Sequence, residues 1–536
     1  MCRGPIDQAS AIGKAPVPEQ HVPLIVIGAG TAGVAAAITA AKGGVQTLLI
    51  DENPLGPDVI GLDVPLHFGQ RANAAIQNKD RMVERIVANN PGLMEAFEAG
   101  IDVALGTYVF GAFINGETVH SMPVPMLGLA DGTRSWMVSF DRLIVATGAR
   151  DLAIAFEGWE KPGVMGARGW HSLVRQYNAF SGRRLLILGS GVTGLGVAQD
   201  ALRAGHEIAG IVEVEAAPVG PADLVAQIQD RSVPIYAAHA VRQATGRAEV
   251  EGAVLVALDV NGAPIEGSDT TVACDTIIYA LGAVPNIELL NVLGCHLEFR
   301  GAAGGYVPVV DAEGATSLAG IYAVGDCTGL QDPQSAAAQG EASAGAVVRS
   351  LAGDAKPVPH AASPAASGMS LYEYWQRWSR AEIAASGWDV HVCQCEEVTR
   401  AEIADLRPPR YLGARPAEMS GHNLRKLGAE SPVNQDQVKR LTRAGMGPCQ
   451  GRRCREQVHM LLSAVTGTPV ETIPLATYRA PVRPLPLQVL AAFEELAAVR
   501  DNWVAWFNIP SQWTPHWEID YAALETVTRK TGIADK

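Results

Sequence analysis

The sequence has no long hydrophobic run and no excess of positive charge. No stretch approaches the ~18 consecutive apolar residues that a membrane-spanning helix needs. The net charge is −14 over 536 residues, which argues against nucleic acid as a partner. The leader Met1–Gln20 is polar and has no apolar core, so it is neither a secretory signal nor an Arg-rich transit peptide. We therefore expect a cytoplasmic protein without a membrane span.

Cysteine is also scarce. The chain has eight, and they are not spaced like a disulfide scaffold, which suits a reducing compartment. Apolar residues make up 48% of the chain, which is enough for large hydrophobic cores. The length predicts two or three domains.

The most informative stretch is Leu24–Asp51, LIVIGAGTAGVAAAITAAKGGVQTLLID. It predicts a strand, a glycine turn, a helix of small residues and a second strand. In this pattern Gly28 permits a tight turn, Gly30 leaves room for a pyrophosphate, and Gly33 lets the helix and the strand pack closely. The N-terminus of the helix then faces the phosphates. Asp51 ends the second strand. Its separation from Gly28 in the sequence is the one at which an acid hydrogen-bonds a ribose hydroxyl in dinucleotide-binding units. The competing interpretation is an ordinary βαβ unit with a glycine turn.

The same pattern occurs a second time. Arg184–Glu213 reads RLLILGSGVTGLGVAQDALRAGHEIAGIVE, and Gly189, Gly191 and Gly194 repeat the glycine spacing. Glu213 ends the second predicted strand of this repeat, as Asp51 does in the first. Because two chance matches in one chain are improbable, the repeat favours two dinucleotide-binding units.

Each unit is followed by a short apolar strand that can return beneath it. Phe140–Ala149, FDRLIVATGA, follows the first unit, and Cys274–Pro285, CDTIIYALGAVP, follows the second. A third such segment, Gly320–Asp326, precedes a predicted helix over Ser335–Ser350. The carboxylate of Asp326 can hold the ribityl hydroxyls of a flavin, and the helix N-terminus favours negative charge on a reduced flavin ring. Farther upstream, residues 53–71 predict a loop and residues 73–98 a helix.

The order GAGTAG, ATGA, GSGVTG, ALGAVP, AVGD resembles that of two-dinucleotide-binding-domain flavoproteins of the pyridine-nucleotide oxidoreductase type, over about residues 20–355. The resemblance implies that the first unit binds FAD and that the second, inserted into it, binds NAD(P). The implied FAD residues are Gly28, Gly30, Gly33, Asp51, Gly148, Gly325 and Asp326. The implied second-nucleotide residues are Gly189, Gly191, Gly194 and Glu213. An acid at Glu213 repels a 2′-phosphate, which favours NAD or another adenine nucleotide over NADP.

Disulfide reductases of this fold need a redox-active cysteine pair. Cys274, Cys295 and Cys327 form no C-x2-C or C-x4-C pair. We therefore do not expect thiol–disulfide exchange, and we interpret Cys327 as a small buried residue beside Asp326.

The other notable cysteines follow a Pro/Ala/Ser-rich stretch and form a C-x-C motif and, farther along the chain, a C-x4-C motif. They are Cys393, Cys395, Cys449 and Cys454. Four thiolates can hold a [2Fe–2S] cluster or Zn²⁺, and zinc sites favour C-x2-C pairs, which are not present here. Between Arg400 and Arg455, twelve Lys and Arg stand against five Asp and Glu, a charge of +7 that suits an anionic cluster. Zinc, reduced structural cysteines and a solvated basic surface remain the alternatives.

The segments CQCEEVTRAEI and NQDQVKRLTRAGMGPCQGRRC resemble the bacterioferritin-associated-ferredoxin-like [2Fe–2S] domain. More specifically, they resemble the form of this domain that is fused to the C-terminal side of flavoprotein subunits of heteromeric amine dehydrogenases. This group includes opine oxidase A subunits, hydrogen cyanide synthase B subunits and alpha subunits of proline or hydroxyproline dehydrogenases. The resemblance implies an alpha-type subunit that relays electrons between flavin and cluster. The resemblance also implies a partner, an FAD-dependent beta subunit of the amine-oxidase-like type. It is compatible with a further small ferredoxin-like subunit.

The implied substrate is an amine, amino acid, imino acid or opine, in which a C–H bond beside nitrogen is broken. No group of His, Asp and Glu in the sequence marks a substrate-oxidising site, so the catalytic residues stay unassigned. Two other functions remain open. One is a self-contained NAD(P)H-dependent reductase that feeds a separate acceptor, and the other is a scaffold subunit with a structural nucleotide site.

The expected fold is α/β, with two Rossmann-like domains, one inserted in the other, then a small mainly helical [2Fe–2S] domain and a Trp-rich tail. The expected parts are a leader (1–20), the FAD-binding domain (21–155 and 274–351), the inserted domain (156–273), a linker (352–388), the [2Fe–2S] domain (389–475) and an extension (476–536). The tail contains Trp503, Trp506, Trp513 and Trp517, which predict an interface anchor or a segment folded onto its own domain.

Overall fold

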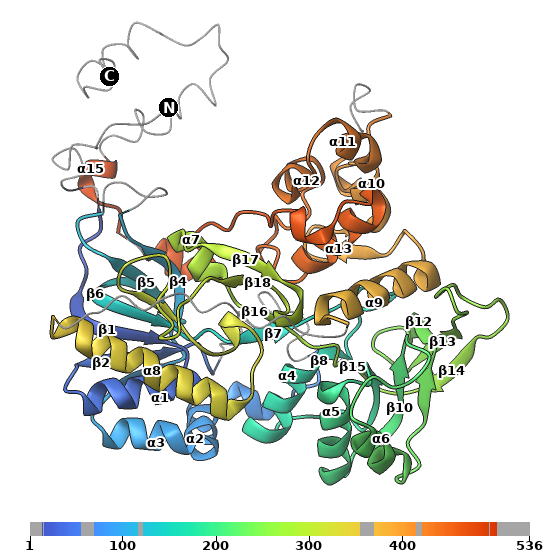
Figure 1. Cartoon of the computed structure of the whole chain (residues 1–536), viewed down its shortest axis with the longest axis horizontal. Coiled ribbons are helices and arrows are strands. Elements are labelled where there is room, and N and C mark those ends of the chain that lie inside the picture. Colours follow the sequence, from blue (N-terminus) through green and yellow to red (C-terminus); the bar gives the residue numbers. More distant parts are fainter. Residues whose placement is uncertain are drawn as a thin grey trace, which may run out of the picture.

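Two Rossmann-like units lie side by side, and a helical domain lies beyond the second of them (Figure 1). The structure is a computed structural model, and it describes residues 13, 15–54, 69–115, 122–353, 369–413, 421–492 and 494–500. The four tail tryptophans therefore lie outside the described residues. Among the described helices, none combines the length and the apolar character needed to cross a membrane.

The first unit is built on a seven-stranded sheet in the order β3-β2-β1-β6-β5-β4, with β19 paired to β6. Its strands are β1 (Gln20–Ile27), β2 (Thr47–Asp51), β3 (Asp102–Leu105), β4 (Tyr108–Phe113), β5 (Met126–Ala130), β6 (Ser135–Val145) and β19 (Ile321–Ala323). Strands β2 and β6 run parallel to β1 on either side of it, and β19 runs parallel to β6. The predicted return of the apolar segments beneath the first glycine turn is thus confirmed.

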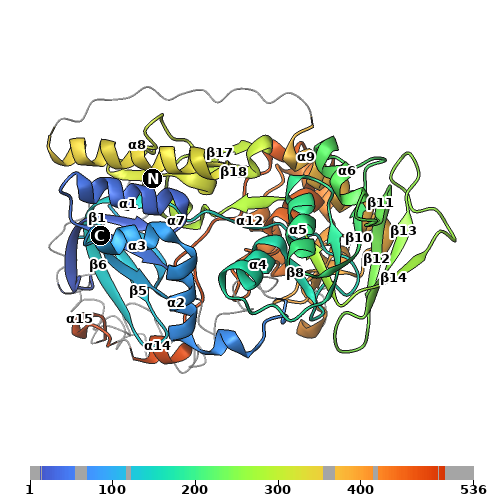
Figure 2. The ribbon, with the colours of Figure 1, turned by 90° about the horizontal axis from the view of Figure 1, so that it is seen from below.

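Helices α1 (Thr31–Lys42) and α8 (Pro333–Leu351) lie together against this sheet (Figure 2). They approach closely because Gly340 has no side chain: a Cβ there would lie 2.1 Å from the Ala32 carbonyl oxygen. Helix α8 contains the predicted helix over residues 335–350.

The second unit has a five-stranded parallel sheet in the order β11-β10-β9-β15-β8, beside a three-stranded antiparallel sheet β12-β13-β14. Its strands are β8 (Val164–Gly166), β9 (Arg184–Leu188), β10 (Glu207–Glu213), β11 (Ile235–Ala237), β12 (His239–Thr245), β13 (Gly252–Ala257), β14 (Thr270–Ala273) and β15 (Thr276–Tyr279). Its helices are α4 (Ala167–His171), α5 (Val192–Arg203) and α6 (Ala222–Gln229).

Two short strands connect the units. Strand β7 (Ala149–Asp151) leaves the first unit, β16 (Ala283–Pro285) returns to it, and the two pair antiparallel. The second unit is therefore inserted into the first, as the sequence predicts. The chain then continues through α7 (Glu288–Leu293), β17 (Leu297–Arg300) and β18 (Gly305–Pro308) to β19.

Residues 73–98 are not one helix. They form a 3₁₀ turn (Ala74–Gln77) and the helices α2 (Lys79–Asn89) and α3 (Pro91–Glu98). The side chain of Asn78 caps α2 by accepting the Arg81 N–H, so a new helix begins there. Pro91 has no N–H to extend α2 and instead starts α3.

The predicted linker over residues 352–388 also needs correction, since it contains helix α9 (Leu371–Ser386). Ser370 and Glu373 form a capping box at its start. Its aromatic side chains Tyr372, Tyr374, Trp375 and Trp378 are buried. The Pro/Ala/Ser-rich composition thus marks a boundary only before residue 370, and the aromatic segment after it belongs to the folded core.

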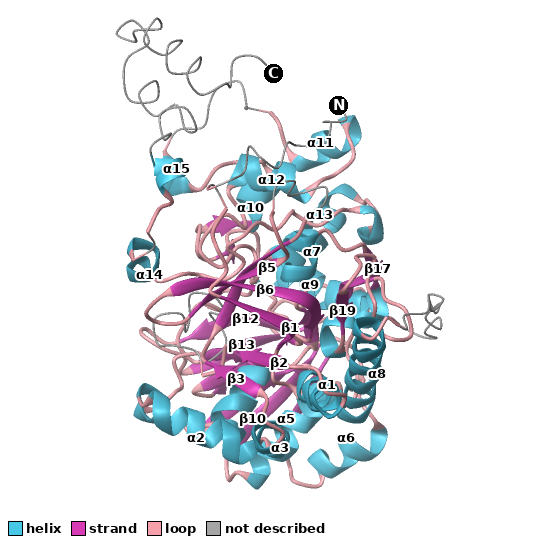
Figure 3. Ribbon diagram, turned by 90° about the vertical axis from the view of Figure 1, so that its left-hand side faces the viewer, coloured by secondary structure: helices cyan, strands magenta, loops and turns pink. Residues whose placement is uncertain are grey.

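The cysteine domain, the segment predicted over residues 389–475, has more helix than strand in its described part, while its bounds and its cluster stay predictions. It contains β20 (His391–Cys393), β21 (Val398–Thr399), α10 (Arg400–Ala404), α11 (Leu424–Glu430), α12 (Gln435–Thr442) and α13 (Arg455–Thr466). Its helices gather at one end of the molecule, beyond the strands of both units (Figure 3). The chain then returns to the first unit, where Val482 N–H donates to the Phe110 carbonyl at 2.7 Å. The last described elements are α14 (Leu487–Ala491) and α15 (Ala497–Arg500).

A buried ion cluster joins the cysteine domain to both connecting segments. Arg150 on β7 pairs with Glu288 on α7 at 3.0 Å and with Glu456 on α13 at 2.9 Å, and the three side chains are 6%, 5% and 8% exposed. Burial opposes the charge of Arg150, but Glu456 and Glu288 outweigh burial and raise the pKa of the guanidinium. Arg150 also donates to the Arg452 carbonyl at 2.8 Å, which places residues 449–454 against the first unit.

We predict that Arg150→Met destabilises the protein by about 3–5 kcal/mol, because it leaves two buried carboxylates without their main cation. Urea unfolding followed by tryptophan fluorescence measures the effect. The matched control is Arg134→Met, which breaks a pair with Glu19 whose side chains are 55% and 49% exposed. That change is expected to cost about 1 kcal/mol or less. Equal unfolding midpoints for the two variants would contradict this role of Arg150.

Candidate functional site

The first glycine turn has the geometry of a dinucleotide-binding turn. Gly28 has φ +106°, and a Cβ there would lie 2.2 Å from the Ala146 carbonyl oxygen. A Cβ at Gly33 would lie 1.8 Å from the Gly28 oxygen, so this glycine allows helix and strand to touch. At Gly30, in contrast, no atom of the described residues lies within 4 Å of a Cβ position, apart from its chain neighbours. This open side of the turn is where the prediction places a pyrophosphate.

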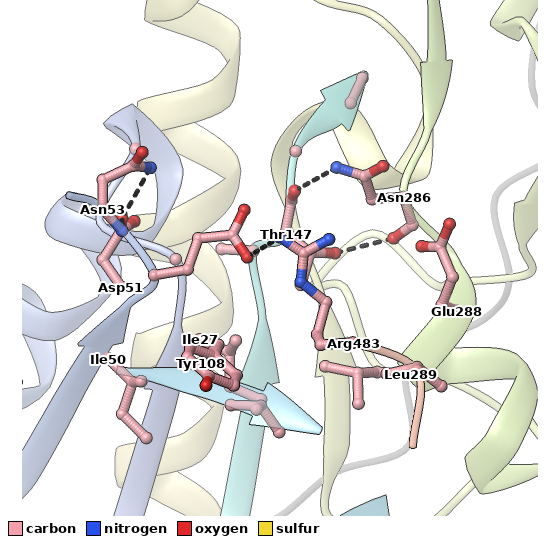
Figure 4. A pocket seen from close by; sticks show the side chains of 18 of the residues that line it. Ile27, Ile50, Asp51, Asn53, Tyr108, Thr147, Asn286, Glu288, Leu289 and Arg483 are labelled. Atoms are coloured by element: carbon pink, nitrogen blue, oxygen red, sulfur yellow. Dashed lines mark hydrogen bonds and ion pairs between the residues drawn. The ribbon is translucent and has the colours of Figure 1, made fainter. Parts of the chain in front are cut away.

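A pocket of about 330 Å³ lies in front of this turn (Figure 4). Four predicted site residues line it: Gly28, Gly30, Asp51 and Gly148. The loop after β6 is held there by Asn286, whose amide donates to the Thr147 carbonyl at 2.9 Å and whose carbonyl accepts the Thr147 hydroxyl at 2.7 Å. The structure therefore brings together the glycine turn, the acid and the ATGA segment around one cavity.

Asp51 is held in place by local donors. Its Oδ2 accepts the Ala29 N–H at 2.7 Å, and its Oδ1 accepts both the backbone and side-chain N–H groups of Asn53 at 2.8 and 3.0 Å. Burial is the largest influence on this carboxyl and raises its pKa, although these hydrogen bonds act in the opposite direction. The carboxylate still lines the pocket, so it remains available to a ribose.

Gly325 and Asp326 are not among the residues that line the pocket. Gly325 has φ +74° and donates its N–H to the Gln339 side chain at 2.7 Å. Asp326 pairs with Arg168 at 2.6 Å, and Arg168 lines the pocket. The predicted ribityl acid is thus connected to the cavity through an arginine that the sequence pattern did not single out.

The cysteine domain and the segment after it also contribute to this pocket, which sequence reasoning missed. Arg452, Val482 and Arg483 line the cavity, and Arg483, which Figure 4 labels, pairs with Glu52, the residue after the predicted ribose acid. Arg452 lies between the two cysteines of the C-x4-C motif. No local pattern could reveal this contact, because Arg452 and Asp51 lie near opposite ends of the chain.

The second glycine turn has the same backbone geometry but a different environment. Gly189 has φ +102°, and a Cβ at Gly194 would lie 1.9 Å from the Gly189 oxygen. Glu213, the predicted ribose acid, is fully buried. Its oxygens accept hydrogen bonds from the Ser190 N–H (3.0 Å) and hydroxyl (2.6 Å), the Glu215 N–H (3.1 Å) and the Tyr374 hydroxyl (2.8 Å).

The four motif cysteines meet in the cysteine domain. The Cys395 Sγ lies 3.9 Å from that of Cys393 and 3.6 Å from that of Cys449, and Cys454 lies with Cys393 in one buried cluster. The two motifs are therefore adjacent in space although they are well separated in the sequence. Within the described ranges, no three His, Cys, Asp or Glu side chains are arranged to hold a single metal ion.

The surroundings of these thiols fit an anionic group. The Gly445 N–H donates to the Cys393 sulfur at 3.4 Å, and a Cβ at Gly447 would lie 2.5 Å from the Cys395 sulfur. Cys454 is the N-cap of α13, where the helix dipole favours negative charge. Gln394 Nε2 and Arg453 Nε are buried donors without a hydrogen-bond acceptor among the described residues.

Three other cysteines are buried and isolated. Burial is the main cause that raises the pKa of Cys274 and of Cys327 to about 12, and that of Cys295 to about 11. A thiol with such a pKa is a poor nucleophile. Cys327 is fully buried, as predicted.

Comparison with known proteins agrees with this architecture. Residues 22–342, more than half of the chain, match the model of the pyridine nucleotide-disulphide oxidoreductase family. The chain belongs to this family. This family member is an FAD-dependent oxidoreductase, and the family as a class binds FAD and NAD(P). Residues 420–494 match the model of the sarcosine oxidase A3 domain.

The similarity extends over most of the length of the relatives. The A chain of the opine oxidase of Agrobacterium tumefaciens is 25% identical over 499 residues, which cover 87% of this chain and 91% of the relative. Hydrogen cyanide synthase subunit HcnB of Pseudomonas aeruginosa is 25% identical over 505 residues, with 88% and 98% covered. The solved structure of L-proline dehydrogenase from P. horikoshii has a TM-score of 0.57 at 21% identity, covers 89% of this chain and 81% of that chain, and shares the fold.

We predict that Gly30→Val yields folded protein without FAD. The open space around Gly30 accommodates the side chain, which then occupies the path of the pyrophosphate. The flavin absorbance of the purified variant measures the loss, and circular dichroism checks the fold. Gly33→Val is the contrasting variant, because its side chain meets the Gly28 oxygen and disrupts the turn itself. Full flavin content in folded Gly30→Val protein would refute the assignment of this turn.

Proposed function

We propose that this oxidoreductase is the alpha-type electron-transfer subunit of a heteromeric dehydrogenase for an amino acid, imino acid or opine. In this proposal FAD binds in the first unit, and a [2Fe–2S] cluster binds at Cys393, Cys395, Cys449 and Cys454. The observation that carries the proposal is the position of residues 449–454. This loop contains two of the four thiols, and its Arg452 lines the first nucleotide pocket.

The donor set supports a binuclear cluster over a mononuclear zinc site. Zinc requires four ligands around one ion, whereas a [2Fe–2S] cluster takes two thiolates on each iron. The Cys395 sulfur lies 3.9 Å from that of Cys393 and 3.6 Å from that of Cys449, and neither motif has the C-x2-C spacing that zinc sites favour. The unpaired N–H donors of Gln394 and Arg453 suit the sulfurs of such a cluster.

The cysteine loop has one arginine for each of the two sites. Arg452 donates to the Val482 carbonyl at 3.5 Å, lies 3.9 Å from Glu288 and lines the nucleotide pocket. Arg453, the next residue, donates to the side chain of Gln394 between the two C-x-C thiols. A bound flavin would supply exchange between two-electron and one-electron chemistry, and a bound cluster would supply one-electron transfer. The loop thus connects the residues that would hold the two groups.

The partners and the substrate class rest on the relatives. The relatives of this chain from opine oxidase, sarcosine oxidase and hydrogen cyanide synthase are each named as one subunit of the enzyme. We propose that the partner, which oxidises the C–H bond beside nitrogen, is an FAD-dependent beta subunit. In the alternative function, a self-contained NAD(P)H-dependent reductase, NADH would need an accessible acid in the second unit to hold its ribose, and Glu213 is fully buried.

We predict that protein purified without oxygen contains about two irons and two sulfides per chain. Cys449→Ser should lose or alter this content, because it removes one of the four thiolates. Iron and sulfide analysis and low-temperature electron paramagnetic resonance of the reduced protein provide the measurements. Cys274→Ser is the matched control, since this buried thiol lies outside the cysteine domain. One tightly bound zinc without iron would disprove the cluster and the relay function with it.

A second prediction separates the two neighbouring arginines. Arg452→Gln should weaken FAD binding by about 10- to 100-fold, the value of a lost hydrogen bond from a charged group. Arg453→Gln should leave FAD affinity unchanged but lower the reduction potential of the cluster, because a positive charge beside it is removed. Flavin release by equilibrium dialysis and a redox titration measure the two effects. If both variants changed the same property, the loop would not divide its arginines between two sites.

A further inference from the structure

Helix α9 lies across the part of the second unit where a dinucleotide would bind. In a Rossmann unit the ligand occupies the crevice at the carboxyl ends of the strands. Tyr374 of α9 donates to Glu213 at the end of β10 (2.8 Å), and Trp375 donates to the Leu281 carbonyl just beyond β15 (2.8 Å). Arg377 of the same helix pairs with Glu215 at 2.8 Å. Figure 1 shows α9 between the second unit and the cysteine domain.

These contacts use the groups that would recognise a ribose. An ionised carboxylate has about four acceptor positions. Glu213 accepts four hydrogen bonds from protein donors, and it has no exposed surface. Two ribose hydroxyls would have to displace the Tyr374 hydroxyl and reach a side chain that is not accessible.

Helix α9 is also anchored on its opposite side. The ring of His459 on α13 donates from Nε2 to the Ile473 carbonyl at 2.8 Å, so its Nδ1 accepts the Tyr372 hydroxyl. Trp375 and Trp378 have no exposed surface. Aromatic side chains of this size bury about 150–250 Å² each. Opening the crevice would therefore expose two indole rings and separate α9 from the cysteine domain.

The two units thus share one sequence pattern and differ in accessibility. In the first, Gly30 and Asp51 line an open pocket. In the second, the acid is enclosed by a helix from the same chain. We propose that α9 covers the ribose-binding end of the dinucleotide crevice of the second unit, so that this unit docks the cysteine domain and does not bind NAD(H) or NADP(H). The nicotinamide nucleotide that the family implies does not fit the second unit. Reducing equivalents must then reach the chain from another donor, and this conclusion holds whatever metal the cysteines bind.

The first test counts adenine nucleotides in the full-length protein by release and chromatography. We expect about one per chain, in the form of FAD. Gly191→Val should leave this number unchanged, because Val219 Cγ2 at 3.9 Å is the one neighbour within 4 Å of a Cβ there among the described residues. Gly30→Val should abolish it. Two nucleotides per chain, with one lost in Gly191→Val, would overturn the proposal.

The second test is an anaerobic titration with NADH and with NADPH. We expect no binding by calorimetry below about 1 mM and no bleaching of the flavin, while dithionite does bleach it. Binding at micromolar concentration would overturn the proposal. Calorimetry measures nucleotide binding to the second unit even when the protein contains no flavin. Absence of FAD would count against the proposed function, whereas binding of NADH or NADPH would count against this inference.

The third test compares the two acids. Glu213→Gln replaces one acceptor oxygen by an N–H₂ group that faces a protein donor, so it should lower the melting temperature by roughly 2–10 °C and leave FAD content unchanged. Asp51→Asn should instead reduce FAD content. If Glu213→Gln does not fold, Tyr374→Phe removes one donor and should lower the melting temperature less. A melting temperature that is unchanged in both Glu213→Gln and Tyr374→Phe would contradict the role of α9.

Discussion

The buried guanidinium of Arg150 is the constraint on which the arrangement of the domains depends. It comes from the strand that leaves the first nucleotide-binding unit, and it pairs with carboxylates from α7 and α13. None of these three charges can be buried alone without a large cost, so the three segments must meet in one geometry. The same side chain hydrogen-bonds the backbone of Arg452. The position of the cysteine loop relative to the first glycine turn follows from this one cluster.

A consequence is that the cysteine domain completes the nucleotide pocket. Arg452 and Arg483 close a cavity whose other walls belong to the first unit. Both arginines are largely buried, and their charges are balanced by Glu288 and Glu52. The short loop of residues 449–454 therefore contributes Arg452 to the pocket and Cys449 and Cys454 to the cysteine motifs.

The two Rossmann units show how one sequence pattern can have two outcomes. Both turns have the positive φ at the first glycine and the close approach at the third. These features depend on residues within one βαβ unit. Whether the crevice stays open depends on what packs over it, and in the second unit this is an aromatic helix from a much later part of the chain. The acid that defines the ribose site is thereby converted into a buried acceptor within the protein.

The sequence by itself determined the two nested units, their glycine turns, the returning strands and the mainly helical cysteine domain, because backbone freedom at glycine and the spacing of apolar residues act over short distances. It also indicated that the two cysteine motifs act together, since thiols of that number and spacing have few other uses. Only the tertiary structure decided that residues 371–386 form a helix over the second crevice, that Arg168 and Arg452 reach the first pocket, and that Glu213 is enclosed. Each of these depends on contacts between segments far apart in the chain, where burial and the pairing of charges select one arrangement that no local pattern encodes.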